Sequence, residues 1–155
     1  MNGATVDQEL TRQRIESVAN YDAFVDLALE LGTNPEAQLF DFLFSHSLLG
    51  GRGGGVAACL LVETDPAPTR SCEELLAEIA TSKWDISAKE LPFFLISWFG
   101  KRFLKDAYRS FIQTANLTSE QKQRVGTIIY WTAGPAANLI RSYHDWPWRE
   151  ADDST

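Results

Sequence analysis

The sequence of 155 residues predicts a mainly α-helical protein, and three observations support that prediction. Apolar residues recur at the spacing of one helix face, most regularly over residues 21–31. Capping boxes, in which a Ser or Thr precedes a Glu or Gln by three positions, occur at Ser71–Glu74 and Thr118–Gln121. Glycines and prolines separate the apolar runs, as at Gly32. We therefore expect a single domain over residues 1–155, built as a bundle of about six to eight helices.

Residues 6–31 are expected to form two successive helices. Thr5 is the predicted N-cap of the first helix and Asn20 that of the second, because both side chains can accept a hydrogen bond from a first-turn N–H group. The second helix, over residues 21–31, is expected to end at Gly32, since glycine is typical of helix C-termini. Its acidic face, spaced by four residues, consists of Asp22, Asp26 and Glu30.

A third helix is predicted to start at residues 34–36, where the Pro of Asn-Pro-Glu suits a first turn. Apolar residues then lie on every side of a helical wheel, which predicts a centrally buried helix. The phenylalanines of residues 40–44 also alternate, so a strand is an open alternative there. The apolar run Val56–Val62 does not distinguish helix from strand, and one short strand pair near 56–62 stays open.

The second half of the chain is expected to be helical as well. Residues 65–68, Asp-Pro-Ala-Pro, predict a rigid connector before a short acidic helix. Ser87–Glu90 repeats the capping-box pattern, but Pro92 lies too deep for an ideal first turn. Either a short turn precedes a helix that starts at Pro92, or the helix is kinked, and it is expected to reach about Ala115. The Thr118 capping box opens the following helix.

The C-terminal part combines a last predicted helix, over residues 136–143, with two tryptophans and an acidic tail, 149–155. Trp146 and Trp148 flank a proline beyond the last apolar period. Because tryptophan is enriched at binding hot spots, we interpret both as partner-binding residues; the alternative is that their rings cover the core.

Half of the ten glycines lie in residues 50–55, interrupted only by Arg52. Such a loop is either a flexible connector or a backbone cradle for an anion, to which Arg52 would add a charge. It matches no nucleotide-binding template, since no Gly-Lys-Ser/Thr follows and Val56 occupies the third-glycine position of a dinucleotide fingerprint. The candidate ligand-binding residues are Gly51, Arg52, Gly53, Gly54 and His46.

The charges are distributed unevenly along the chain, whose formal net charge is -7. Residues 1–80 carry 13 acidic and four basic side chains, whereas residues 81–149 carry five acidic and ten basic ones. The acidic part suits a basic partner and argues against a general nucleic-acid binder, which needs clustered Lys and Arg. We interpret the basic residues of one helical arc as a docking strip for an acidic partner, or else as a solvated face: Lys101, Arg102, Lys105 and Arg109.

Residues with catalytic or metal-binding chemistry are few. His46 has Asp41 and Ser45 nearby in an apolar segment, which predicts a buried hydrogen-bonded cluster; a general acid–base role would require a cleft. Cys59 lies in an apolar run, which predicts a buried, unreactive thiol. The His and Cys spacings fit no metal site, so we assign no catalytic residue, metal or cofactor.

These observations favour a non-catalytic protein-binding module of the inhibitor, immunity-type or adaptor class, which uses charged surfaces and C-terminal aromatics. Two alternatives stay open: an enzyme or sensor that binds a small ligand or anion at residues 50–55, and a homodimeric structural or regulatory subunit with residues 93–111 or Trp146–Trp148 at its interface. The N-terminus lacks a secretory pattern, and the longest apolar run, Pro92–Phe99, is shorter than the ~20 residues of a membrane span. A cytoplasmic location is therefore expected.

Overall fold

A computed structural model describes residues 7–86 and 89–133, and it confirms the mainly α-helical class. These residues form eight α-helices and one 3₁₀ turn, and none of them forms a strand. The elements are α1 (Gln8–Ser17), α2 (Tyr21–Leu31), α3 (Glu36–Ser47), α4 (Gly51–Thr64), α5 (Cys72–Ala80), α6 (Glu90–Phe99), α7 (Lys101–Thr114), α8 (Ser119–Tyr130) and η1 (Trp131–Ala133).

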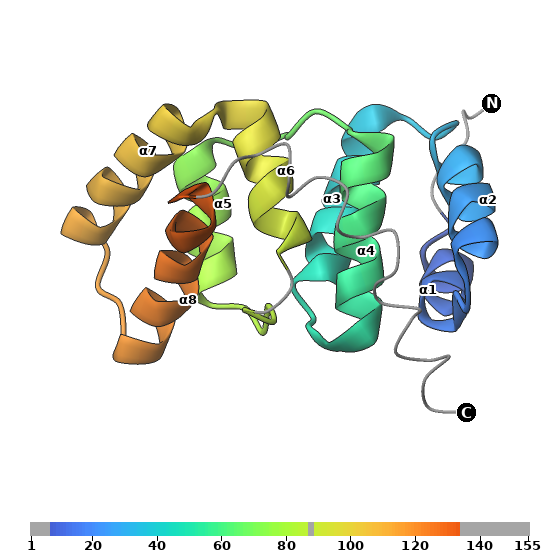
Figure 1. Cartoon of the computed structure of the whole chain (residues 1–155), viewed down its shortest axis with the longest axis horizontal. Coiled ribbons are helices and arrows are strands. Elements are labelled where there is room, and N and C mark those ends of the chain that lie inside the picture. Colours follow the sequence, from blue (N-terminus) through green and yellow to red (C-terminus); the bar gives the residue numbers. More distant parts are fainter. Residues whose placement is uncertain (1–6, 87–88, 134–155) are drawn as a thin grey trace.

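The helices stand side by side across the long axis of the molecule, so that the bundle is an elongated row (Figure 1). Helices α1 and α2 lie at one end of the row, and α7 and α8 lie at the other. Helix α4 is central: it packs against α1, α2, α3 and α6, while α5 packs against α7 and α8. The two ends of the row are therefore joined through the middle helices.

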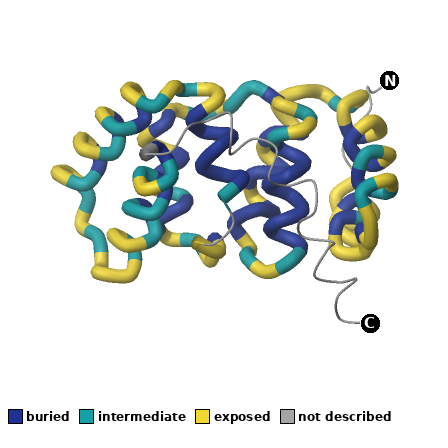
Figure 2. Tube along the Cα trace, in the orientation of Figure 1, coloured by how far each residue is buried: buried dark blue, intermediate teal, exposed yellow. Residues whose placement is uncertain are grey.

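Burial follows the same arrangement, because the middle helices α4 and α6 are buried over most of their length (Figure 2). The apolar residues form one core cluster with members from every helix, from Ile15 in α1 to Ile128 in α8. Phe40 in α3 stacks on Phe94 in α6 with ring centroids 5.8 Å apart, which ties two middle helices together. The prediction that α3 is buried nearly all round is confirmed, apart from exposed positions such as Asp41 and Ser45.

The predicted helix caps are largely confirmed. The Asn20 side chain accepts a hydrogen bond from the Ala23 N–H at 2.8 Å and starts α2. Both capping boxes form, at Ser71–Glu74 before α5 and at Thr118–Gln121 before α8. Helix α1 differs from prediction, since the Asp7 carboxylate, and not Thr5, caps it by accepting from the Leu10 N–H.

One further prediction was wrong, and two open alternatives are decided in favour of helix. The helix expected over residues 92–115 is interrupted at Gly100, whose φ of +82° ends α6 and sets the new direction of α7. Pro92 lies within the first turn of α6. The N–H groups of a first turn have no intrahelical acceptor, so a proline there removes no helix hydrogen bond. The run 56–62, for which a strand pair was left open, lies inside the 14-residue helix α4, and residues 40–44 lie inside α3.

The glycine segment is the largest correction, because residues 51–55 are not a loop but the first turns of α4. Close packing explains Gly50, Gly53 and Gly54, whereas a Cβ atom at Gly51 would meet nothing within 4 Å. A Cβ atom at Gly50 would lie 2.5 Å from the Lys83 carbonyl oxygen, and one at Gly54 would lie 3.0 Å from the Ser47 carbonyl oxygen. Gly50 also has a φ of +78°, which favours glycine. The segment thus lets α4 approach neighbouring backbone closely.

Glu90, the first residue of α6, is a buried carboxyl group with 1% of its surface exposed. Burial raises the pKa of Glu90 to about 6, because the charged form is poorly solvated there, while hydrogen bonding to its own backbone and the charge of Lys89 act in the opposite direction. The Ser87 half of the predicted capping box lies outside the described residues, as do the predicted helix 136–143 and the tail 149–155.

We expect Gly54→Ala to lower the free energy of unfolding by about 1–3 kcal/mol, since the added methyl group meets rigid backbone. The matched control is Gly126→Ala in α8, where a Cβ would lie 3.6 Å from the Tyr108 hydroxyl, an ordinary contact. Because alanine is the better helix former, this control should raise the free energy by about 1 kcal/mol. Urea denaturation measures both. Equal stabilisation by the two changes would contradict the packing role of Gly54.

A second prediction concerns Glu90. Its raised pKa means that folding favours the protonated form, so its contribution to stability is present below about pH 4.5 and is lost as the pH rises through about 6. Glu90→Gln should therefore be more stable than the wild type at pH 7, by about 2 kcal/mol, and equally stable near pH 4. Urea denaturation from pH 4 to 8 gives the difference, and a pH-independent difference would contradict the assignment.

Candidate functional site

Glu16 in α1 and His46 in α3 form a polar contact between two helices. The Glu16 Oε2 atom lies 3.0 Å from Nε2 of His46, whose side chain is only 2% exposed. Because a carboxylate only accepts, Nε2 carries the proton and donates it. The other ring nitrogen, Nδ1, is buried and has no hydrogen-bond partner among the residues that the structure describes. The prediction of a buried, hydrogen-bonded His46 is confirmed, with Glu16 as its partner in place of Asp41 or Ser45.

Arg52 and the glycines of α4 complete this region. The Arg52 guanidinium donates to the carbonyl oxygens of Glu16 and Val18, which lie at the C-terminal end of α1 and lack helical partners. Gly53 lies directly under the Glu16 side chain, so a Cβ there would overlap the carboxylate. Of the candidate ligand-binding residues, Gly53 and Gly54 are thus buried in helix contacts, Gly51 is exposed, and Arg52 binds backbone.

A polar cleft of about 500 Å³ lies between α1 and α3, beside the Glu16–His46 contact. Gln8, Arg12 and Glu16 follow one another at intervals of four, so they share the face of α1 that meets α3. The lining residues are Gln8, Arg12, Gln38, Asp41, Phe42, Ser45, His46 and Leu49. Sequence reasoning missed the contribution of α1, although the spacing of residues 8, 12 and 16 was a usable signal.

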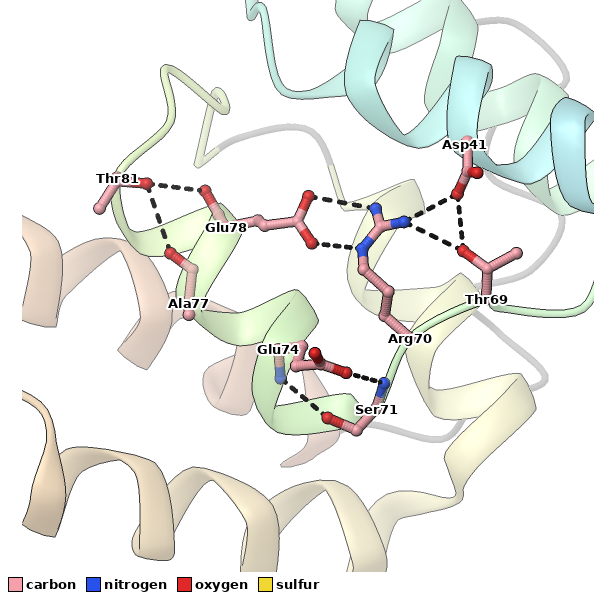
Figure 3. Close-up of polar contacts among 8 residues, drawn as sticks. All are labelled: Asp41, Thr69, Arg70, Ser71, Glu74, Ala77, Glu78 and Thr81. Carbon is pink, nitrogen blue, oxygen red and sulfur yellow. Dashed lines mark hydrogen bonds and ion pairs between the residues drawn. The ribbon is translucent and has the colours of Figure 1, made fainter.

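Arg70, in the connection between α4 and α5, joins two helices through its guanidinium (Figure 3). Its Nε and Nη2 atoms donate to the two carboxylate oxygens of Glu78 in α5, at 2.5 and 3.1 Å. Its Nη1 atom donates to Asp41 in α3 at 2.7 Å and to the Thr69 hydroxyl at 3.0 Å. The hydrogen bond to Glu78, ahead of the contacts with Asp41, raises the pKa of Arg70, so the group stays charged.

The two predicted charged surfaces lie at opposite ends of the row, because α2 and α7 occupy its two ends (Figure 1). On α2, Asp22, Asp26 and Glu30 are all exposed, and Glu30 pairs with Arg14 of α1. On α7, Arg102 and Arg109 are exposed, and Lys101 and Lys105 are half-buried. The acidic and basic residues therefore do not pair with each other within one molecule.

Exposed aromatic rings lie close to the basic residues. Phe103 on α7 is 56% exposed and stacks on Phe99 of α6 with ring centroids 5.9 Å apart. A hollow of about 350 Å³ beside it runs between α5 and α7, with Phe103, Ala107 and Cys72 among its lining residues.

Both cysteines are thiols buried in the core, as expected for Cys59. Burial, and secondly the charge of Glu90, raises the pKa of Cys59 well above its usual value. Burial, and secondly Glu73, raises the pKa of Cys72 to about 11. Neither thiol is therefore ionised near neutral pH, which makes both poor nucleophiles.

Trp146 and Trp148, the predicted C-terminal anchors, lie outside the described residues. Within residues 7–86 and 89–133, no group of three or more metal-binding side chains comes together. The helices of this part of the chain are also too short or too polar to cross a membrane. In comparisons with protein-family models, curated proteins and solved structures, the chain matches none of them.

We expect Arg70→Lys to lower the free energy of unfolding by about 1 kcal/mol, because an ammonium group cannot reproduce the two-pronged contact with Glu78. The estimate is small because the partner carboxylates are partly solvated. Arg109→Lys is the control, since Arg109 is exposed and lies 3.6 Å from Asp106. Thermal denaturation compares the two variants, and equal melting temperatures would contradict the proposed link between α3 and α5.

Proposed function

We propose that the protein is a non-catalytic protein-binding module, and that the outward face of α7 is its docking strip for an acidic partner. The docking strip consists of Lys101, Arg102, Lys105 and Arg109. The observation that carries the proposal is the charge at the start of α7, where Lys101 and Arg102 form the first turn together with no acidic residue.

That charge placement is unfavourable for the helix itself. The N-terminal end of a helix carries a partial positive charge, so each nearby cation costs roughly 0.3–1 kcal/mol. The first turn of α7 contains no acidic residue, the residue type that would favour this end of the helix. Residues that break a local rule of stability are frequently retained for function. A negatively charged protein surface would be attracted to this end of the molecule over a distance of about 8–10 Å.

Apolar contact area is available next to the docking strip. Phe103 follows Arg102 in the chain, and the hollow between α5 and α7 lies beside its ring. Arg and large aromatics are enriched among the residues that dominate binding energies. We therefore infer that charge speeds the encounter and that Phe103 supplies part of the binding energy.

The acidic face of α2 supports a second version of the same function, in which a basic partner binds the other end. In this version Glu30 is already paired with Arg14, as Arg109 of the docking strip is with Asp106. Binding through Trp146 and Trp148, and a homodimer formed through residues 93–111, remain predictions from the sequence.

The experiment is an affinity capture with the full chain from a lysate of the source organism, followed by kinetic measurement with the purified partner. We expect an acidic protein to be captured stoichiometrically by the wild type and lost by Arg102→Glu/Lys105→Glu. Its association rate should fall as salt is raised, because exposed charges are screened.

The matched control, Asp22→Lys/Asp26→Lys, changes charge at the other end and should retain that partner. If only the control variant lost binding, the partner-binding site would lie on α2 and not on α7. A wild type that captures no stoichiometric partner, or an association rate insensitive to salt, would count against the α7 docking strip.

A further inference from the structure

The cleft between α1 and α3 is separate from the docking strip, since α1 and α7 lie at opposite ends of the row (Figure 1). Its volume of about 500 Å³ falls within the range of roughly 300–1,000 Å³ that is typical of small-molecule sites. The two helices are tied beside it by the contact from Glu16 to His46. A small molecule, and not a macromolecular surface, suits a space of this size.

Arg12 supplies a cationic group to the cleft. Its guanidinium lines the cleft and lies 3.4 Å from Glu9, a long contact between two exposed side chains. Such an exposed pair contributes only about 0–1 kcal/mol, so Arg12 can exchange Glu9 for an anionic ligand at little cost. Glu9 itself is not among the residues that line the cleft.

The carboxylates next to the cleft are engaged elsewhere. Asp41 lines it, but its Oδ1 atom accepts hydrogen bonds from Arg70 and Thr69 (Figure 3). Glu16 accepts from His46. One oxygen of each carboxylate is therefore engaged by a protein group, and Arg12 is the one Arg or Lys among the residues that line the cleft.

Neutral hydrogen-bonding groups surround that cation. Gln8 and Gln38 each offer an amide that both donates and accepts, and Ser45 offers a hydroxyl. His46 lines the same cleft, and its Nδ1 atom is the buried polar atom without a partner described above. Phe42 supplies an apolar wall. Groups of this kind pair with the hydroxyls of a ligand, whereas Arg12 pairs with its anionic group.

We propose that the α1–α3 cleft binds a small hydroxylated organic anion, with Arg12 at the anionic group and Gln8, Gln38 and Ser45 at the hydroxyls. A hydroxycarboxylic acid and a sugar phosphate share this chemistry. The site goes beyond the protein-binding function, and neither depends on the other.

The experiment is isothermal titration calorimetry of the full chain with four probes: gluconate, glucose 6-phosphate, glucose and inorganic phosphate. We expect gluconate or glucose 6-phosphate to bind, and the one that binds identifies the anionic group. Glucose and inorganic phosphate should bind at least about tenfold more weakly than that probe, a difference of ~1.4 kcal/mol. The reason is that glucose lacks the anionic group and inorganic phosphate lacks the hydroxyls of the carbon chain.

Arg12→Gln should weaken binding of the anionic probe by about tenfold or more, and Gln38→Ala by several-fold. The control is Arg109→Gln, which removes the same charge at the far end of the molecule and should leave affinity within about twofold. Arg12 and Gln38 are surface residues, so their variants should fold, as circular dichroism would verify.

The proposal is overturned if neither gluconate nor glucose 6-phosphate binds the wild type. It is also overturned if glucose or inorganic phosphate binds as tightly as the hydroxylated anions, since the cleft would then not recognise both the anionic group and the hydroxyls. Equal weakening by Arg12→Gln and Arg109→Gln would show that affinity follows overall charge and not the cleft.

Discussion

Helix α4 can lie at the centre of the bundle because its first turns are made of glycine. Each glycine in a helix interior costs about 1 kcal/mol relative to alanine, so three successive buried ones are a substantial local penalty. The penalty is offset by contacts that side chains would prevent. Gly54 lies against the backbone of Ser47, and Gly53 lies under the Glu16 carboxylate. The packing of α1 and α3 on α4 depends on both.

Polar side chains then determine how the helices around α4 are held. Arg52 binds the carbonyl groups at the end of α1, Glu16 binds His46 in α3, and Arg70 connects α3 to α5. Each contact joins segments that are distant in the sequence. Directional contacts of this kind favour one arrangement over others, since a shifted helix would leave the polar groups without these partners. The N-terminal half is therefore specified by directional contacts as well as by its apolar core.

The elongated shape separates the surfaces that carry the proposed functions. The docking strip on α7 and the acidic face of α2 lie at opposite ends, so their charges do not neutralise each other within the molecule. The cleft lies near the acidic end, yet Arg12 gives it a cationic group, and Arg70 and His46 donate hydrogen bonds to the adjacent carboxylates. Net charge alone would have predicted a preference for cations there.

The sequence by itself determined the helical class and the local signals that start helices. The Asn20 cap and the two capping boxes involve residues three positions apart, so their formation depends on local geometry alone. The sequence could also have predicted the helix break at Gly100, since glycine readily adopts the positive φ found there. Only the tertiary structure decided the role of the glycine segment and the partner of His46. Glycine has low helix propensity, which favours a loop locally; packing against α1 and α3 overrides that preference. Glu16 and His46 are 30 residues apart in the sequence, so local periodicity does not predict their contact.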